Sequence, residues 1–391
     1  MPQPPPFHPP IPVAAAFLVT ALAAAVAAAA DRPWERIEIR ADEGPRTVEA
    51  AIVVEAEDGG LLVEHRDERY ELLQPREILA RATTPGAPAD ETPRALGQRL
   101  LAELPAGFDV LVTRHYVVCF DTSRDYAKWC AAVFERLHEA FVNYWSKAGL
   151  EVADPQRPLV VVIFADRRRY AEHAARDLGP AAERVVGYYN LLSNRVTTFD
   201  LTGSDLVQRP PGRPRAGSAA EILASPAAAG LVSTLVHEAT HQMAFNCGMH
   251  RRLAPVPLWV SEGIATYFET PDLENTRGWR GVGAVNRPRL DHFLAHHAAG
   301  DIEAIVAADD RFRAADGPLD AYAAAWALTR HLLDTRKRQF VDYLRTQAAK
   351  QPLADDSREG RLREFEAAFG ITPAALEDDV VKAMARLAAQ R

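Results

Sequence analysis

The chain has 391 residues, 48% of them apolar and 25% charged, which is ordinary for a globular protein with room for two or three domains. It carries 45 Lys and Arg against 53 Asp and Glu, a formal net charge of -8. This mild acidity, without any basic stripe, argues against a nucleic-acid-binding protein. The three cysteines, Cys119, Cys130 and Cys247, do not form the pattern of a disulfide framework, although an oxidising compartment would allow one bridge.

Residues 1–30 predict an export segment. They contain no Asp, Glu, Lys or Arg, and the run from Val13 to Ala30 is almost entirely apolar. Small residues precede Asp31, as at a signal-peptide cleavage site. The run of about eighteen residues is also just long enough for an uncleaved membrane anchor. In either case we expect the remainder to be exported to the periplasm, the cell envelope or the medium.

Residues 31–82 predict a small all-β module, and residues 83–94 a linker rich in Pro and Thr. A turn at Asp58-Gly59-Gly60 is expected to join two of the strands. The predicted strands are Ile37–Arg40, Val48–Glu57, Leu61–His65 and Arg69–Leu73. The module contains no constellation of chemically active residues, so a packing or accessory binding role is expected.

Residues 95–275 predict a mixed α/β unit. Its expected elements are a β-rich run Val110–Phe120, a helix from Ser123 to about Lys147, a buried strand Leu159–Phe164, a helix Arg167–Leu178 and a hairpin of Gly187–Tyr189 with Arg195–Leu201. An edge strand in this hairpin would offer free backbone groups to an extended peptide; an ordinary edge hairpin is the alternative. The segment Gly203–Ser218 is expected to be a loop bordering the site.

The last part, residues 276–391, is expected to be mostly helical after a loop-like stretch. The predicted helices are Leu319–Leu333, Phe340–Ala349, Arg361–Phe369 and Pro373–Ala389. The whole chain is therefore expected to be an α+β protein, with a β module before a mixed sheet and a helical C-terminal subdomain.

An HExxH sequence, His237 to His241, lies inside an apolar helical run. Ser225 and Pro226 predict the start of this helix and Gly248 its end. Residues four apart lie on one face of a helix, so the two histidines can present their imidazoles to one metal ion. Two imidazoles and the Glu238 carboxylate are costly to bury without partners, by several kcal/mol, and a metal ion would provide one.

A catalytic Zn²⁺ takes three protein ligands and keeps one position open, so a third ligand is needed beyond His237 and His241. Glu262 is the favoured candidate. It is predicted to lie in the first turn of a new helix capped by Ser261. The competing candidates are Glu269, Asp272 and Cys247.

With zinc bound, the pKa of its water would fall to about 7, and Glu238 would take the proton and pass it to the leaving amine. The oxyanion needs a hydrogen-bond donor, a role for which Tyr322 is the candidate. Tyr322 lies in an apolar helical pattern with Trp326 one turn on, so a role as a core aromatic is its alternative.

The HExxH motif, followed by the stretch WVSEGIATYFE at residues 259–269, resembles the gluzincin clan of zinc peptidases. The span from Tyr116 to Leu333 resembles a peptidase-MA-like family of exported bacterial proteins with no assigned substrate. The resemblance implies a thermolysin/aminopeptidase-like zincin unit. No GAMEN-type loop precedes the HExxH helix, so it does not extend to aminopeptidase specificity.

The same resemblance implies His237, His241 and Glu262 as zinc ligands and Glu238 as general base. It also supports Tyr322, because related enzymes place a tyrosine on a later helix. We therefore expect an exported metallopeptidase with one catalytic Zn²⁺ that acts on a peptide or protein substrate. The alternatives are a zinc hydrolase of a non-peptide amide and a catalytically inactive, peptidase-like envelope binding protein.

Overall fold

The computed structural model describes residues 32, 34–41, 44–84, 91–203, 228–270, 272, 279–314 and 318–390. The predicted export segment, residues 1–30, lies outside this range, as do the helix start at Ser225 and Pro226 and residues 204–218 of the predicted loop. Among the described residues, no helix has the length and apolar character needed to cross a bilayer.

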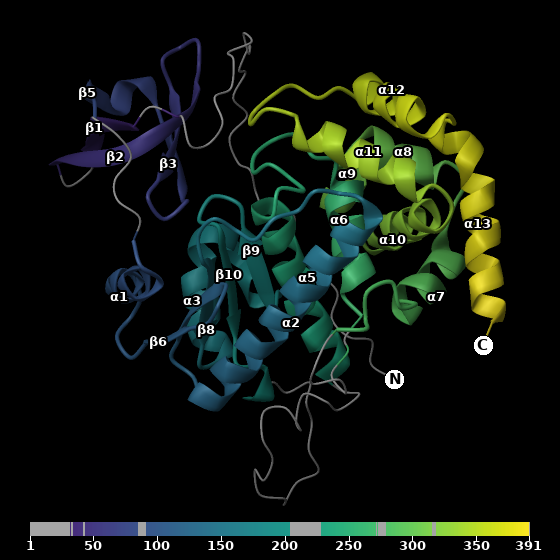
Figure 1. The fold of residues 1–391 in the computed structure, drawn as a ribbon, viewed down its shortest axis with the longest axis horizontal. Coiled ribbons are helices and arrows are strands. Elements are labelled where there is room, and N and C mark those ends of the chain that lie inside the picture. Colours follow the sequence, from purple (N-terminus) through teal and green to yellow (C-terminus); the bar gives the residue numbers. More distant parts are fainter. Residues whose placement is uncertain are drawn as a thin grey trace, which may run out of the picture.

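The first sheet is antiparallel throughout and has the strand order β4-β3-β2-β1-β5 (Figure 1). Its strands are β1 Trp34–Ala41, β2 Gly44–Glu55, β3 Leu61–His65, β4 Tyr70–Leu73 and β5 Ile78–Thr83. Alternate residues such as Ile37, Ile39 and Val63 form its own small core. The sequence did not predict β5, because its residues are mostly exposed and show no apolar alternation.

The second sheet is mixed, with the strand order β6-β7-β8-β10-β9. Its strands are β6 Asp109–Val112, β7 Tyr116–Phe120, β8 Leu159–Phe164, β9 Gly187–Asn190 and β10 Arg195–Phe199. The β7, β8 and β10 strands are parallel, and all residues of β7 and β8 are buried. The predicted hairpin is confirmed, but its first strand, β9, forms the sheet edge, because β10 pairs on both sides.

In the described part of the chain, four helices surround the second sheet. They are α1 Pro93–Glu103, α2 Arg124–Ala148, α3 Arg167–Leu178 and α5 Ala229–Asn246. The α1 helix begins within the predicted linker and packs on β6 and β7. The predicted cap is confirmed at α2, where the Ser123 side chain accepts a hydrogen bond from Tyr126 N. The α5 helix packs on α2, β9 and β10, so it lies between the sheet and the helical part of the chain.

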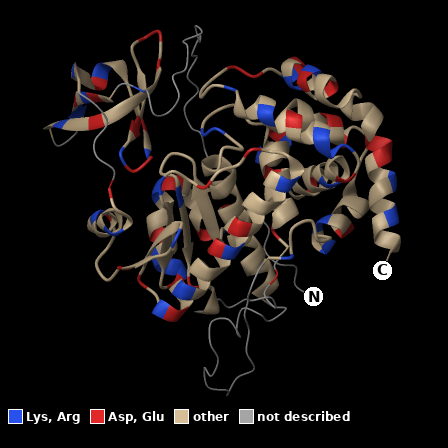
Figure 2. Cartoon of the chain, viewed as in Figure 1, with Lys and Arg blue, Asp and Glu red and all other residues tan. Residues whose placement is uncertain are grey.

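The helical part follows α5 and ends in helices that lie at the periphery of the molecule (Figure 1). Its helices are α6 Leu258–Phe268, α7 Arg287–His296, α8 Asp301–Ala307, α9 Asp310–Arg313, α10 Pro318–Thr335, α11 Lys337–Ala348, α12 Arg358–Phe369 and α13 Pro373–Ala389. Figure 2 shows Lys and Arg interspersed with Asp and Glu along the outer helices α11 to α13, so neither sign forms a continuous stripe there in this view.

A close contact between α6 and α10 depends on Gly263. A Cβ at this position would lie 2.1 Å from Thr329 Oγ1 and 2.9 Å from the Ala325 carbonyl oxygen, both on α10. Tyr322 is one turn before Ala325 on the same face of α10. The glycine next to Glu262 therefore lets the helix that carries Tyr322 pack directly on α6.

The predicted start of α6 is wrong. The helix begins at Leu258 after Pro257, so Ser261 lies inside it and its hydroxyl donates to the Leu258 carbonyl oxygen at 3.4 Å. Glu262 consequently lies in the second turn, and the helix-dipole argument for its carboxylate does not apply. The fully buried Trp259 explains the earlier start, because helix formation here buries a large apolar side chain.

The first sheet is held against the hairpin β9–β10 by its β3–β4 turn. Tyr70 N donates to the Leu192 carbonyl oxygen at 2.7 Å, and Asn194 Nδ2 donates to Glu68 Oε2 at 2.9 Å. The Arg252 guanidinium donates to the Glu68 carbonyl oxygen at 2.6 Å and lies 3.9 Å from the centre of the Tyr70 ring. The module thus supports the turn of the hairpin whose edge strand reaches the HExxH helix.

Candidate functional site

The HExxH motif lies in the middle of α5, which is apolar on nearly every face. His237 is fully buried, and Glu238 retains only 5% of its exposure. The helix ends at Asn246, and its capping residue Cys247 is followed by Gly248 with φ 87°, so the predicted glycine stop is confirmed. Burial of this polar set fits a helix whose histidines and carboxylate each have a partner.

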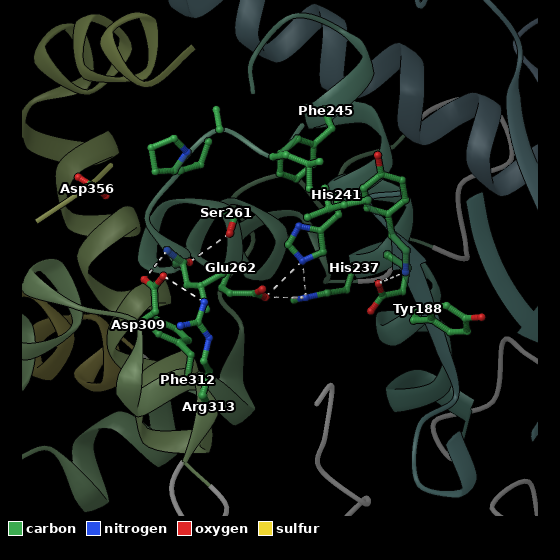
Figure 3. A pocket seen from close by; sticks show the side chains of 18 of the residues that line it. Tyr188, His237, His241, Phe245, Ser261, Glu262, Asp309, Phe312, Arg313 and Asp356 are labelled. Atoms are coloured by element: carbon green, nitrogen blue, oxygen red, sulfur yellow. Dashed lines mark hydrogen bonds and ion pairs between the residues drawn. The ribbon is translucent and has the colours of Figure 1, made fainter. Parts of the chain in front are cut away.

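His237, His241 and Glu262 converge on one point. Figure 3 shows the Glu262 side chain reaching from α6 toward both imidazoles. Glu262 Oε2 lies 3.0 Å from His237 Nε2 and 3.3 Å from His241 Nε2, and the two ring nitrogens are 3.1 Å apart. The structure therefore brings together the three residues that the sequence singled out as ligands.

The chemistry of this cluster fits a zinc ion. Ligand atoms at about 2.0–2.2 Å from a tetrahedral zinc lie roughly 3.3 Å from one another, close to the separations among these three atoms. Burial disfavours the ionised Glu262 carboxylate, but the neighbouring His241 and His237 outweigh this effect and hold its pKa well below the usual range. Glu262 thus stays ionised, as a metal ligand must.

Glu269, a competing ligand candidate, lies on the other side of His237. Its Oε2 is 2.9 Å from His237 Nδ1, while its Oε1 accepts hydrogen bonds from Asn286 Nδ2 at 2.7 Å and Arg289 Nε at 3.0 Å. Burial works against ionisation here too, but Arg289 and His237 lower the pKa of Glu269 to about 2. A carboxylate at Nδ1 fixes the tautomer and orientation of the ring, leaving Nε2 toward the cluster.

The two other ligand candidates lie outside this cluster. Asp272 Oδ2 accepts a hydrogen bond from Arg280 N at 2.5 Å. Cys247 follows the last turn of α5, ten residues after His237, which corresponds to about 15 Å along a helix. Among the competitors, only Glu269 is near the histidines, and it contacts the opposite ring nitrogen.

Glu238 is oriented by the edge strand. Its Oε2 accepts a hydrogen bond of 2.7 Å from the backbone N–H of Tyr189 in β9. Glu238 lines a cavity of about 490 Å³ together with His237, His241 and Glu262. Tyr188 and Tyr189 form part of one wall of this cavity, and the α9 residues Phe312 and Arg313 part of another. The carboxylate is therefore exposed to the same space as the ligand cluster.

Tyr322 also lines this cavity, so the structure brings it to the site. Its ring centre lies 6.2 Å from that of His237, and the Arg289 guanidinium carbon lies 5.4 Å from the Tyr322 ring. Burial, followed by the charge of Glu262, raises the pKa of Tyr322 well above its usual value. Its hydroxyl therefore keeps its proton and can donate a hydrogen bond.

Sequence reasoning missed two groups of residues around the site. Asn286 and Arg289, which hold Glu269, lie in and just after a stretch that resembled a loop, with no spacing that marks them. The end of the cavity away from the histidines is built by ion pairs of Arg361 with Asp309 at 2.6 Å and Asp356 at 2.5 Å. Both groups come from segments that meet only when the helical part folds.

The chain is similar in part to a known protein family. Residues 231–354 match a family model described as a protein of unknown function (DUF1570). No curated protein matches the chain. The matched residues include the HExxH motif, Glu262, Glu269 and Tyr322, whereas Tyr189 of the edge strand and Arg361 lie outside the match.

Proposed function

We propose that the chain is an exported zinc-dependent metallopeptidase of the gluzincin type that hydrolyses bonds in a peptide or protein. The observation that carries this proposal is the convergence of His237 Nε2, His241 Nε2 and Glu262 Oε2, with separations of 3.0 to 3.3 Å. The buried Glu269 carboxylate behind His237 supports it, because metal-bound histidines usually have such a partner. Export is inferred from residues 1–30.

The fold supports the same proposal at a coarser level. A mixed sheet with β9 at its edge, an HExxH helix beside that edge and a helical C-terminal part are the elements expected of a thermolysin/aminopeptidase-like zincin unit. The cavity of about 490 Å³ lies within the range of roughly 300–1,000 Å³ that is usual for ligand pockets. It has room for substrate side chains next to the cluster.

The catalytic roles follow from the residues around the cluster. Bound zinc would supply Lewis-acid polarisation of the scissile carbonyl and a lowered pKa of the attacking water. Glu238, oriented by Tyr189 N–H, takes the proton of that water and passes it to the leaving amine. Tyr322, which keeps its proton, donates a hydrogen bond to the developing oxyanion.

Metal removal tests the proposal. We expect the full-length chain to hold one zinc at His237, His241 and Glu262 that is lost in the double variant His237→Ala/His241→Ala, and to cleave a peptide library. A chelator should stop cleavage and added zinc should restore it. Absence of zinc from the cluster would refute the proposal. Zinc binding with hydrolysis of only non-peptide amides would favour a zinc hydrolase of such amides instead of a peptidase. Zinc binding without any hydrolysis would favour a catalytically inactive binding protein.

Replacing Tyr322 with phenylalanine tests the oxyanion role. We expect kcat to fall by about 10²–10³-fold, the usual effect of removing one oxyanion donor. KM, zinc content and Tm should change little, because phenylalanine preserves the ring between Phe312 and His237. An unchanged kcat would show that Tyr322 is not the oxyanion donor and only packs in the helix core. Trp326→Phe, one turn away on α10 and fully buried, controls for effects of a changed helix core.

A further inference from the structure

A second cluster of metal-ligating side chains lies at the C-terminal end of α5. His115 from the β6–β7 turn, His138 from α2 and Asp154 from the segment after α2 offer ligand atoms that all lie within 4.8 Å of one another. The rings of His115 and His138 stack with their centres 4.0 Å apart. Cys247, which ends α5, places its Sγ 3.9 Å from His138 Nε2. Three segments thus bring ligand atoms together, and the end of α5 lies against one of them, His138.

His115 is oriented as a ligand. Glu135 Oε2 lies 2.6 Å from His115 Nδ1, and Glu135 Oε1 accepts hydrogen bonds from His115 N and Thr113 Oγ1. A carboxylate at Nδ1 holds the ring proton there and turns the Nε2 lone pair toward the cluster, as Glu269 does for His237. His115 Nε2 is buried and has no hydrogen-bond partner among the described residues. A buried nitrogen of this kind requires an explanation, and a cation would provide it.

The other members have suitable chemistry and spacing. His138 is 2% exposed, and burial, with a smaller effect of His115, lowers its pKa to about 4, so it is a neutral imidazole at pH 7. The two Asp154 carboxylate oxygens lie 3.5 Å from His115 Nε2 and 3.8 Å from His138 Nε2. The first separation lies within the roughly 3.3–3.5 Å between ligand atoms of a tetrahedral zinc, and the second is a few tenths of an ångström wider.

We propose that this cluster is a second metal site, structural in role and suited to zinc. Three of its ligands already lie together, His115 Nε2, His138 Nε2 and the half-exposed Asp154 carboxylate, and we assign the Cys247 thiolate, whose Sγ lies 3.9 Å from His138 Nε2, as the fourth. The thiol proton passes to solvent as the metal binds. The metal ties the end of the HExxH helix to α2 and to the β6–β7 turn. The alternative without metal is a hydrogen-bonded arrangement in which His115 lies between the Glu135 and Asp154 carboxylates.

Metal counting in a variant that lacks the two histidines of the HExxH motif tests this second site. We expect the full-length His237→Ala/His241→Ala variant to retain one zinc per chain. Adding His138→Ala or Cys247→Ser to that background should remove this zinc or weaken its binding at least tenfold. Adding His292→Ala is the matched control, because His292, His296 and Asp320 form a more exposed cluster of similar composition. Metal retained by both test variants, or absent from the double variant itself, would overturn the proposal.

Cobalt substitution identifies the thiolate by a spectroscopic signal that does not depend on metal counting. In the otherwise unaltered chain loaded with Co²⁺, we expect a thiolate-to-cobalt charge-transfer band. The band should disappear in Cys247→Ser and persist in Cys119→Ser, whose buried thiol lies in β7. A cobalt-loaded chain without the band would overturn the site as proposed. Since neither readout requires peptide hydrolysis, failure of this site and failure of the proposed peptidase activity are distinguishable.

Discussion

Replacing Glu238 with glutamine is expected to reduce kcat for peptide hydrolysis by about 10²–10⁴-fold, the usual contribution of a general base. The amide oxygen of glutamine still accepts a hydrogen bond from Tyr189 N, so the side chain keeps its position while losing its ability to take a proton. Zinc content should stay unchanged, because Glu238 is not among the three converging ligands. Steady-state kinetics and metal analysis on the same preparation measure both quantities.

A control for charge comes from the same cavity. Asp355 also lines it, on the segment between α11 and α12, so Asp355→Asn removes one carboxylate without altering the HExxH helix. We expect its kcat to stay within a few fold of the unaltered enzyme. If Glu238→Gln were equally active, Glu238 would not be the base, and the hydrogen bond to Tyr189 would be a structural feature of α5 and β9.

Zinc affinity is expected to depend differently on Glu262 in α6 and on Glu269, the residue that follows the end of that helix. Glu262→Ala removes a ligand atom that lies 3.0 and 3.3 Å from the two histidine nitrogens, so we expect loss of zinc under conditions that keep the unaltered protein loaded. Glu269→Gln keeps a hydrogen-bond acceptor near His237 Nδ1 but removes the charge. Its affinity should fall by about 10–100-fold, the usual effect of changing a group behind a ligand.

Competition with a calibrated chelator measures the zinc affinity of both variants. The measurement is made in the Cys247→Ser background, so that only zinc at His237, His241 and Glu262 is counted. Glu303→Ala, an exposed glutamate on α8, is the control and should leave affinity unchanged. A larger loss in Glu269→Gln than in Glu262→Ala would make Glu269 the third ligand and assign the supporting role to Glu262.

Local patterns in the sequence predicted several elements closely. The apolar run of β8 and the helix Arg167–Leu178 have the predicted bounds, and Ser123 caps α2 as expected. Such features depend on neighbours within one or two turns of the chain, so the sequence carries them directly. The strand β5 was missed because its mostly exposed residues show no apolar alternation. The start of α6 was missed because it depends on the burial of Trp259, which no local capping pattern indicates.

The candidate site likewise has features that the local sequence encodes and features that only the packing of helices decides. The sequence by itself determined that His237 and His241 share a helix face, because a spacing of four is a property of the helix alone. It favoured Glu262 over Glu269 as the third ligand, but partly on a predicted helix start that is wrong, and both residues are carboxylates about two helical turns apart. Only the packing of α6 across α5 placed Glu262 at the Nε2 side of His237 and Glu269 at its Nδ1 side, where Asn286 and Arg289 hold it. Those contacts join residues 17 to 32 positions apart, and no local pattern encodes them.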